Sequence, residues 1–244
     1  MHKFIPLLIA ASVVSGSAPA SGANAGSPYA TMAPLARYLA ANPADEIALA
    51  RSAAPASISD SATILVLGKA GYETAVKGTN GFACFVQRSW AQDFDNAQFW
   101  NPKIHTPQCW NAAAVRSVLP SYLKRTGWAL AKVSKEEMAK RTTAAWAAHE
   151  FTAPAPGSMA YMLSKDQYIQ DPQPGSEARW YPHVMFFMPA SEEGKWGANE
   201  HGSPMFSATS SSEPVTTFFV IVPKWSDGSV YPYPAPAAGS HHHE

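Results

Sequence analysis

Residues 62–90 read ATILVLGKAGYETAVKGTNGFACFVQRSW and carry the clearest strand and turn pattern in the chain. Three short apolar runs, at residues 63–67, 72–76 and 82–86, are separated by two turns that contain glycine. The pair Asn80-Gly81 favours a tight hairpin, because both residues tolerate the positive φ that such a turn needs. The stretch predicts an antiparallel three-stranded meander.

The rest of the chain extends this pattern. Continuous apolar runs at residues 158–163, 183–188 and 215–222 are typical of strands buried on both faces. Helices are predicted near residues 44–53, 111–119 and 135–149, the last with Ser134 and Glu137 as a capping box. The predicted fold is α+β: a mostly antiparallel sheet of about six strands, with the meander at its N-terminal end, covered by three or four helices.

The N-terminal 25 residues have the pattern of a signal peptide. An apolar run, residues 4–14, is too short to span a membrane and is followed by the small-residue sequence Ala23-Asn24-Ala25, typical of a cleavage site. No later run reaches the roughly 18 apolar residues of a transmembrane helix. We therefore expect an exported protein, periplasmic or secreted, with one α+β domain over residues 26–230 and a disordered Pro- and His-containing tail over 231–244.

The charge balance argues against a nucleic-acid partner. The chain has 18 Lys and Arg against 18 Asp and Glu, and no basic run. The partner expected from composition is a small molecule or another surface. No motif indicates a cofactor.

Cys84 and Cys109 are the only cysteines. In an oxidising compartment such a pair predicts one disulfide, which would stabilise the fold by roughly 3 kcal/mol by closing a loop of this length. The alternative, a nucleophilic or metal-bound thiol, requires a partner His or a Cys-x-x-Cys spacing, and neither is visible.

Three segments resemble a recurring set in exported bacterial proteins with no assigned activity. They are GTNGFACFVQRSW (residues 78–90), FWNPKIHTPQCWNAAAVRSVLP (99–120) and WYPHVMFFMP (180–189). The likeness covers about residues 44–228. It implies a bacterial exported protein built as one unit and assigns no catalytic or binding residue.

His183 is the main candidate for chemistry, since it begins an apolar strand directly after Trp180 and Tyr181. A histidine in that position suits a general base or a ligand, with Glu200 or Glu177 as the carboxylate partner. The alternative is a buried histidine bonded to backbone.

A metal site of His183, Glu200 and His201 is a weaker alternative, because imidazole and carboxylate suit zinc or iron. No His-Glu-x-x-His or Cys/His cluster supports it.

Loop aromatics suggest a binding surface. Trp180, Tyr181 and Trp196 could form a platform around His183 for a small or apolar ligand, or they could seal a core under long loops. Two functions follow. The favoured one is a non-enzymatic module that binds a ligand or partner through these loops, and the alternative is a hydrolase-like enzyme centred on His183.

Overall fold

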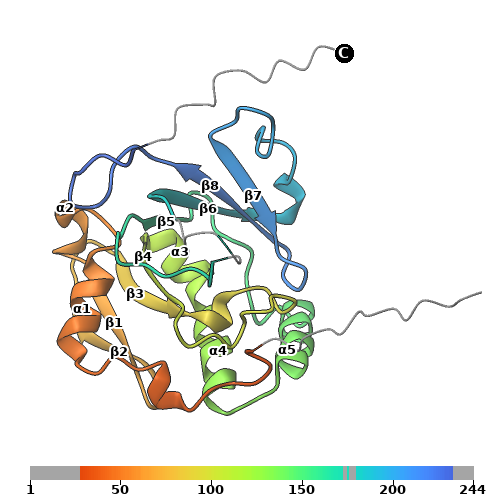
Figure 1. Ribbon diagram of the computed structural model, residues 1–244. Helices are drawn as coiled ribbons and strands as arrows, with labels where there is room; N and C mark the ends of the chain where they lie inside the picture. The colour runs from red at the N-terminus through yellow and green to blue at the C-terminus, as the bar shows by residue number, and fades with distance from the viewer. Residues whose placement is uncertain (1–27, 173–174, 176–179, 233–244) are drawn as a thin grey trace, which may run out of the picture.

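The computed structural model describes residues 28–172, 175 and 180–232; the predicted signal peptide and nearly all of the predicted tail lie outside these ranges. One mixed sheet has the strand order β2-β1-β3-β4-β5-β6-β8-β7 (Figure 1). Its strands are β1 (Thr63–Gly68), β2 (Gly71–Val76), β3 (Ala83–Arg88), β4 (His105–Trp110), β5 (Met159–Met162), β6 (His183–Pro189), β7 (Met205–Thr209) and β8 (Val215–Ile221). The α-helices are α1 (Pro43–Arg51), α2 (Ala56–Ser59), α3 (Ala112–Ser117), α4 (Leu119–Leu130) and α5 (Lys135–Ala147), with 3-10 turns η1 (Leu35–Arg37), η2 (Ser89–Ala91) and η3 (Ala190–Glu192).

The α+β class and the mostly antiparallel sheet are confirmed, but the sheet has eight strands instead of about six. The sequence pattern missed β4 and β7. Strand β4 contains Pro107, a residue that usually argues against a central strand. It is tolerated because β5 pairs with β4 only at Cys109 and Trp110, so Pro107 does not interrupt that ladder. Strand β7 is short, lies at the sheet edge and contains no continuous apolar run.

The predicted three-stranded meander is wrong. Strands β1 and β2 form the expected antiparallel hairpin, but β3 lies on the other side of β1 and runs parallel to it. The segment from residue 77 to 82 is therefore a crossing connection and not a hairpin turn. Its backbone passes the start of β1, where Thr79 N donates to Ser61 O at 2.8 Å and Thr63 N donates to Phe82 O at 2.8 Å.

The turn residues Asn80 and Gly81 stabilise this crossing connection. The Asn80 side chain donates to Ile58 O at 2.8 Å, and Gly81 has the positive φ expected of it, +79°. Gly78 is required for a different reason. A Cβ atom at that position would lie 2.2 Å from the backbone of Ala62 and Thr63. Only glycine allows so close an approach.

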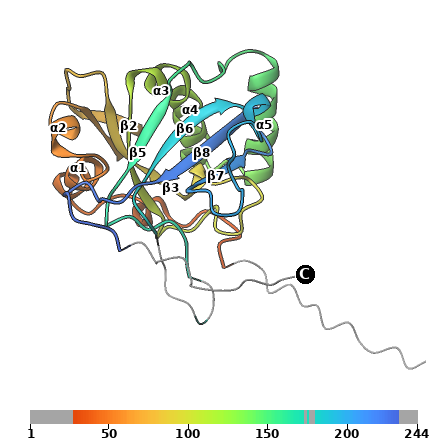
Figure 2. The ribbon, with the colours of Figure 1, turned by 90° about the horizontal axis from the view of Figure 1, so that it is seen from above.

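Helices cover both faces of the sheet (Figures 1 and 2). On one face α1 packs over Ile64, Cys84 and Val86. On the other face α3, α4 and α5 contribute to a larger core that contains Phe85 and Trp110. The predicted disulfide is confirmed: Cys84 and Cys109 lie directly opposite each other on β3 and β4.

The three predicted helices are present as α1, α3 and α5, but the described residues contain five helices instead of three or four. The Asn42 side chain caps α1, and Ser134 Oγ accepts from Glu137 N at the start of α5. Pro120 occupies the first turn of α4, which continues to Leu130. Among the described helices, none combines the length and the apolar character needed to cross a bilayer.

A buried ion pair joins the N-terminal segment to the centre of the sheet. Arg88 Nη2 lies 2.9 Å from Glu46 Oε1, and both side chains are at most 4 % exposed. Arg88 also donates to Tyr38 O, at 2.7 Å, and to Val86 O. Glu46 accepts from Leu67 N at 3.1 Å, so both charges have hydrogen-bond partners, as buried charges require.

The close approach at Gly78 gives a stability prediction. Gly78→Ala should lower the free energy of unfolding by about 3 kcal/mol or more, because the added Cβ displaces the start of β1. The control is Gly127→Ala in α4, where a Cβ meets nothing within 4 Å. That variant should be stabilised by about 0.5–1 kcal/mol, the difference in helix propensity. Urea unfolding measures both, and equal effects of the two substitutions would contradict the crossing described here.

Candidate functional site

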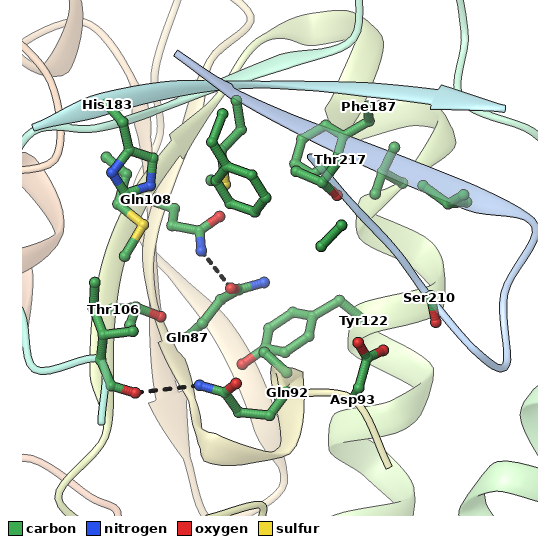
Figure 3. A pocket seen from close by; sticks show the side chains of 18 of the residues that line it. Gln87, Gln92, Asp93, Thr106, Gln108, Tyr122, His183, Phe187, Ser210 and Thr217 are labelled. Atoms are coloured by element: carbon green, nitrogen blue, oxygen red, sulfur yellow. Dashed lines mark hydrogen bonds between the residues drawn. The ribbon is translucent and has the colours of Figure 1, made fainter. Parts of the chain in front are cut away.

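A cavity of about 630 Å³ lies between the α4 side of the sheet and the segments that cover it (Figure 3). Strands β3, β4, β5, β6, β7 and β8 all contribute side chains to its wall. The register explains which side chains these are, because residues two apart on a strand share a face. The paired residues on the cavity face include Gln87 with Thr106, Met162 with His183, Met185 with Phe219, and Phe187 with Thr217.

The opposite wall comes from α4 and from loops. Tyr122 and Arg125 project from α4, and Gln92 and Asp93 follow η2. Gln92 Nε2 donates to Ile169 O at 3.2 Å, which links the two covering loops. The lining is mixed, because apolar side chains such as Met185 and Phe187 share it with polar and charged ones such as Gln108 and Glu213.

His183 enters the cavity from the first position of β6 and is 4 % exposed. Its Nδ1 lies 2.8 Å from Tyr181 O. Burial lowers the pKa of this imidazole, and the bond to the Tyr181 carbonyl offsets that effect only in part. The ring is therefore neutral at pH 7. Its orienting partner is a backbone carbonyl and not the carboxylate that the sequence suggested.

A relay of side-chain hydrogen bonds crosses the middle of the cavity floor. Trp110 Nε1 donates to Gln108 Oε1 at 2.6 Å, and Gln108 Nε2 donates to Gln87 Oε1 at 2.5 Å. Both glutamines are less than 10 % exposed. Burying amide groups costs free energy unless they are hydrogen-bonded. The relay supplies these bonds to both amide groups, except at the amide nitrogen of Gln87.

Charged groups gather at one part of the lining. The Arg125 guanidinium stacks over the Phe94 ring at 3.9 Å, close enough for a cation–π contact. Burial raises the pKa of the Glu213 carboxyl. The positive charge of Arg125 opposes this rise in the pKa, and the negative charge of Asp93 adds to it. Burial also lowers the pKa of Arg125, and the two carboxylates offset this. The Nε and Nη2 atoms of Arg125 are buried and have no hydrogen-bond partner among the described residues.

The structure brings together three of the four predicted binding residues. Trp180, Tyr181 and His183 line the cavity. Trp196 does not; it packs on Phe218 at 5.6 Å between ring centroids. Because Phe218 alternates with the cavity-facing Phe219 on β8, Trp196 lies on the other face of the sheet.

The metal alternative gains no support. Glu200 and His201 are exposed on the loop between η3 and β7 and do not line the cavity that holds His183. Within the described ranges, no three His, Cys, Asp or Glu side chains are placed to hold a metal ion. Glu177, the other suggested carboxylate partner, lies outside the described residues.

Sequence reasoning missed Gln87, Thr106, Gln108, Arg125 and Glu213. A usable pattern was present for the first three. Gln87 is a polar residue in an otherwise apolar run, and Thr106 and Gln108 share the period of two that places residues on one face of a strand. The positions of Arg125 and Glu213 depend on how α4 and the β7–β8 hairpin pack, and no local pattern contains that information.

Comparison with models of known protein families, with characterised proteins and with solved structures finds no match to this chain.

The neutral His183 makes stability depend on pH. The folded imidazole has a lowered pKa, so below about pH 6.5, the ordinary value, the unfolded chain takes up a proton that the folded chain resists. The free energy of unfolding should therefore fall as the pH drops from about 7.5 to about 5. Burial lowers the pKa of His105 as well, so part of the slope belongs to that residue.

Urea unfolding at both pH values, on wild type and on His183→Gln, tests this assignment. The variant should show a shallower fall, since the titrating group is gone. His201→Gln, at an exposed loop position, is the matched control and should keep the wild-type slope. A His183→Gln slope equal to that of wild type would show that the imidazole takes up its proton freely in the folded state.

Proposed function

We propose that this chain is an exported, non-enzymatic binding protein that holds a small, largely apolar ligand in the cavity between the sheet and α4. The cavity itself is the observation that carries the proposal. Its volume of about 630 Å³ lies within the range usual for small-molecule sites. Apolar walls, formed by residues such as Met185, Phe187 and Phe219, would supply most of the binding free energy through burial.

Export is supported by the predicted signal peptide over residues 1–25 and by the Cys84–Cys109 disulfide, which is compatible with an oxidising compartment. The resemblance to exported bacterial proteins points the same way. The proposed location is periplasmic or secreted, where a carrier or sensor of small apolar molecules would meet its ligand.

The two loop tryptophans offer a direct test. N-phenyl-1-naphthylamine, an uncharged fluorescent probe, should bind the wild type with a rise in its fluorescence. Trp180→Ala, which opens the cavity wall, should weaken binding by about tenfold, or 1.4 kcal/mol. Trp196→Ala is the matched control on the other face and should leave the affinity unchanged.

A second variant blocks the cavity. Ala208 on the edge strand β7 faces the cavity opposite Thr217, and its side chain is exposed enough to accept a larger residue. Ala208→Trp should abolish probe binding while the far-UV circular dichroism stays as in wild type. Binding that survives Ala208→Trp and depends instead on Trp196 would move the site to the outer face of the sheet.

A hydrolase centred on His183 is the alternative proposal. It is favoured by one observation: the second ring nitrogen, Nε2, is hydrogen-bonded to no described residue, so it is available as a general base. Against it, no carboxylate among the described residues orients the ring. A screen of ester substrates with wild type and His183→Ala distinguishes the binding function from the hydrolase. Turnover by the wild type that is lost in His183→Ala would favour the hydrolase.

A further inference from the structure

Three polar groups on the cavity floor have unused hydrogen-bonding capacity. Nε2 of His183, Nε2 of Gln87 and the hydroxyl of Thr106 have no hydrogen-bond partner among the described residues, although each residue is at most 8 % exposed. Figure 3 shows the His183 ring and the Gln87 amide directed into the cavity. The three residues line the cavity, and these atoms are open to it instead of sealed in the core, so a ligand in the cavity can reach them.

The role of His183 follows from its neighbour. A carbonyl oxygen can only accept, so the Nδ1 atom that lies 2.8 Å from Tyr181 O carries the proton. In a neutral imidazole the other nitrogen then has a free lone pair. Nε2 of His183 is therefore a hydrogen-bond acceptor, and a complementary ligand presents a donor to it.

The role of Gln87 is fixed from the other end of the relay. The Trp110 indole nitrogen is only a donor, so the Gln108 atom next to it is the amide oxygen. Gln108 then offers its NH₂ group to Gln87, whose oxygen must be the acceptor. The NH₂ group of Gln87 is left facing the cavity as a donor. A complementary ligand presents an acceptor to it.

The floor between these groups carries no formal charge. The Arg88 guanidinium forms an ion pair with Glu46 and donates hydrogen bonds to two backbone carbonyls. Arg125, Asp93 and Glu213 also line the cavity, but none of them belongs to a strand of the floor; Arg125 lies over the Phe94 ring, and its Nε and Nη2 atoms have no hydrogen-bond partner among the described residues. A charged group placed between Gln87 and His183 would lose its hydration without meeting an opposite charge, which is strongly unfavourable.

Spacing sets the size of the molecule. Gln87 lies on β3 and His183 on β6, three places apart in the sheet. At about 4.8 Å per strand their backbones are about 14 Å apart, and both side chains reach inward. A molecule of two linked or fused rings spans the remaining distance over the apolar floor.

We propose that the cavity selects an uncharged molecule of about two rings, with a hydroxyl that donates to Nε2 of His183 and an oxygen at the far end that accepts from the Gln87 amide. This inference rests on the binding function proposed above and adds the ligand's chemistry. Thr106, opposite Gln87 on β4, can share the ligand's acceptor.

Three biphenyl probes test the proposal on the full chain by isothermal titration calorimetry. The first carries a hydroxyl at one end and an acetyl group at the other. The second replaces the hydroxyl by methoxy, which removes only the donor. The third replaces the acetyl group by a carboxylate. The hydroxyl–acetyl probe should bind about tenfold more tightly than each of the others.

Two variants assign the preference to its residues. His183→Phe keeps a ring but removes the acceptor, so it should weaken the hydroxyl–acetyl probe about tenfold and leave the methoxy probe unchanged. Gln87→Met should weaken the hydroxyl and methoxy probes equally, because both carry the acetyl acceptor. His201→Ala, at an exposed position, should change none of the affinities.

The outcomes separate this inference from the binding function. Equal affinity of wild type for the hydroxyl and methoxy probes would overturn the acceptor role of His183 without any variant having to fold. Tightest binding of the carboxylate probe would overturn the uncharged ligand. If N-phenyl-1-naphthylamine binds and no biphenyl does, the ligand class is wrong and the binding function stands. If neither kind of probe binds, the binding function itself fails.

Discussion

The two-sided burial of the β3–β4 ladder is the constraint on which the rest of the structure depends. Every residue of β3 is buried, and Cys84 and Cys109 join the two strands at directly opposite positions. Side chains alternate across this ladder, so one face needs α1 and the other needs α3, α4 and α5 as cover. Arg88 ends the strand with a buried charge, and satisfying that charge holds Glu46 and the Tyr38 backbone against the same ladder.

The cavity is a consequence of how the second face is covered. Helix α4 and the loop after η2 close over the strands but do not fill the space above Gln87, Gln108 and His183. The apolar wall favours an apolar ligand, while the directed hydrogen bonds of the floor restrict which one. The donor at Trp110 and the carbonyl of Tyr181 fix that direction, because neither group can reverse its role.

The aromatic residues divide between two roles that sequence could not separate. Trp90, Phe94, Phe99, Trp100 and Trp110 are all buried and form much of the larger core. Trp180 and Tyr181 border the cavity, and Trp196 packs on the far face of the sheet. A tryptophan in a loop carries the same local pattern in each case, so only the packing of the loop distinguishes core from site.

The sequence by itself determined the elements whose information is local. The apolar runs at β1, β5, β6 and β8, the capping box at Ser134 and the cysteine pair all identified real features, because hydrophobic period and capping chemistry act over a few residues. The tertiary structure alone decided that β3 crosses to run parallel to β1, that Pro107 lies within a central strand, and that Gln87, His183 and Arg125 share one cavity. These depend on contacts between residues far apart in the chain, such as the approach of Gly78 to Ala62, and no local period encodes them.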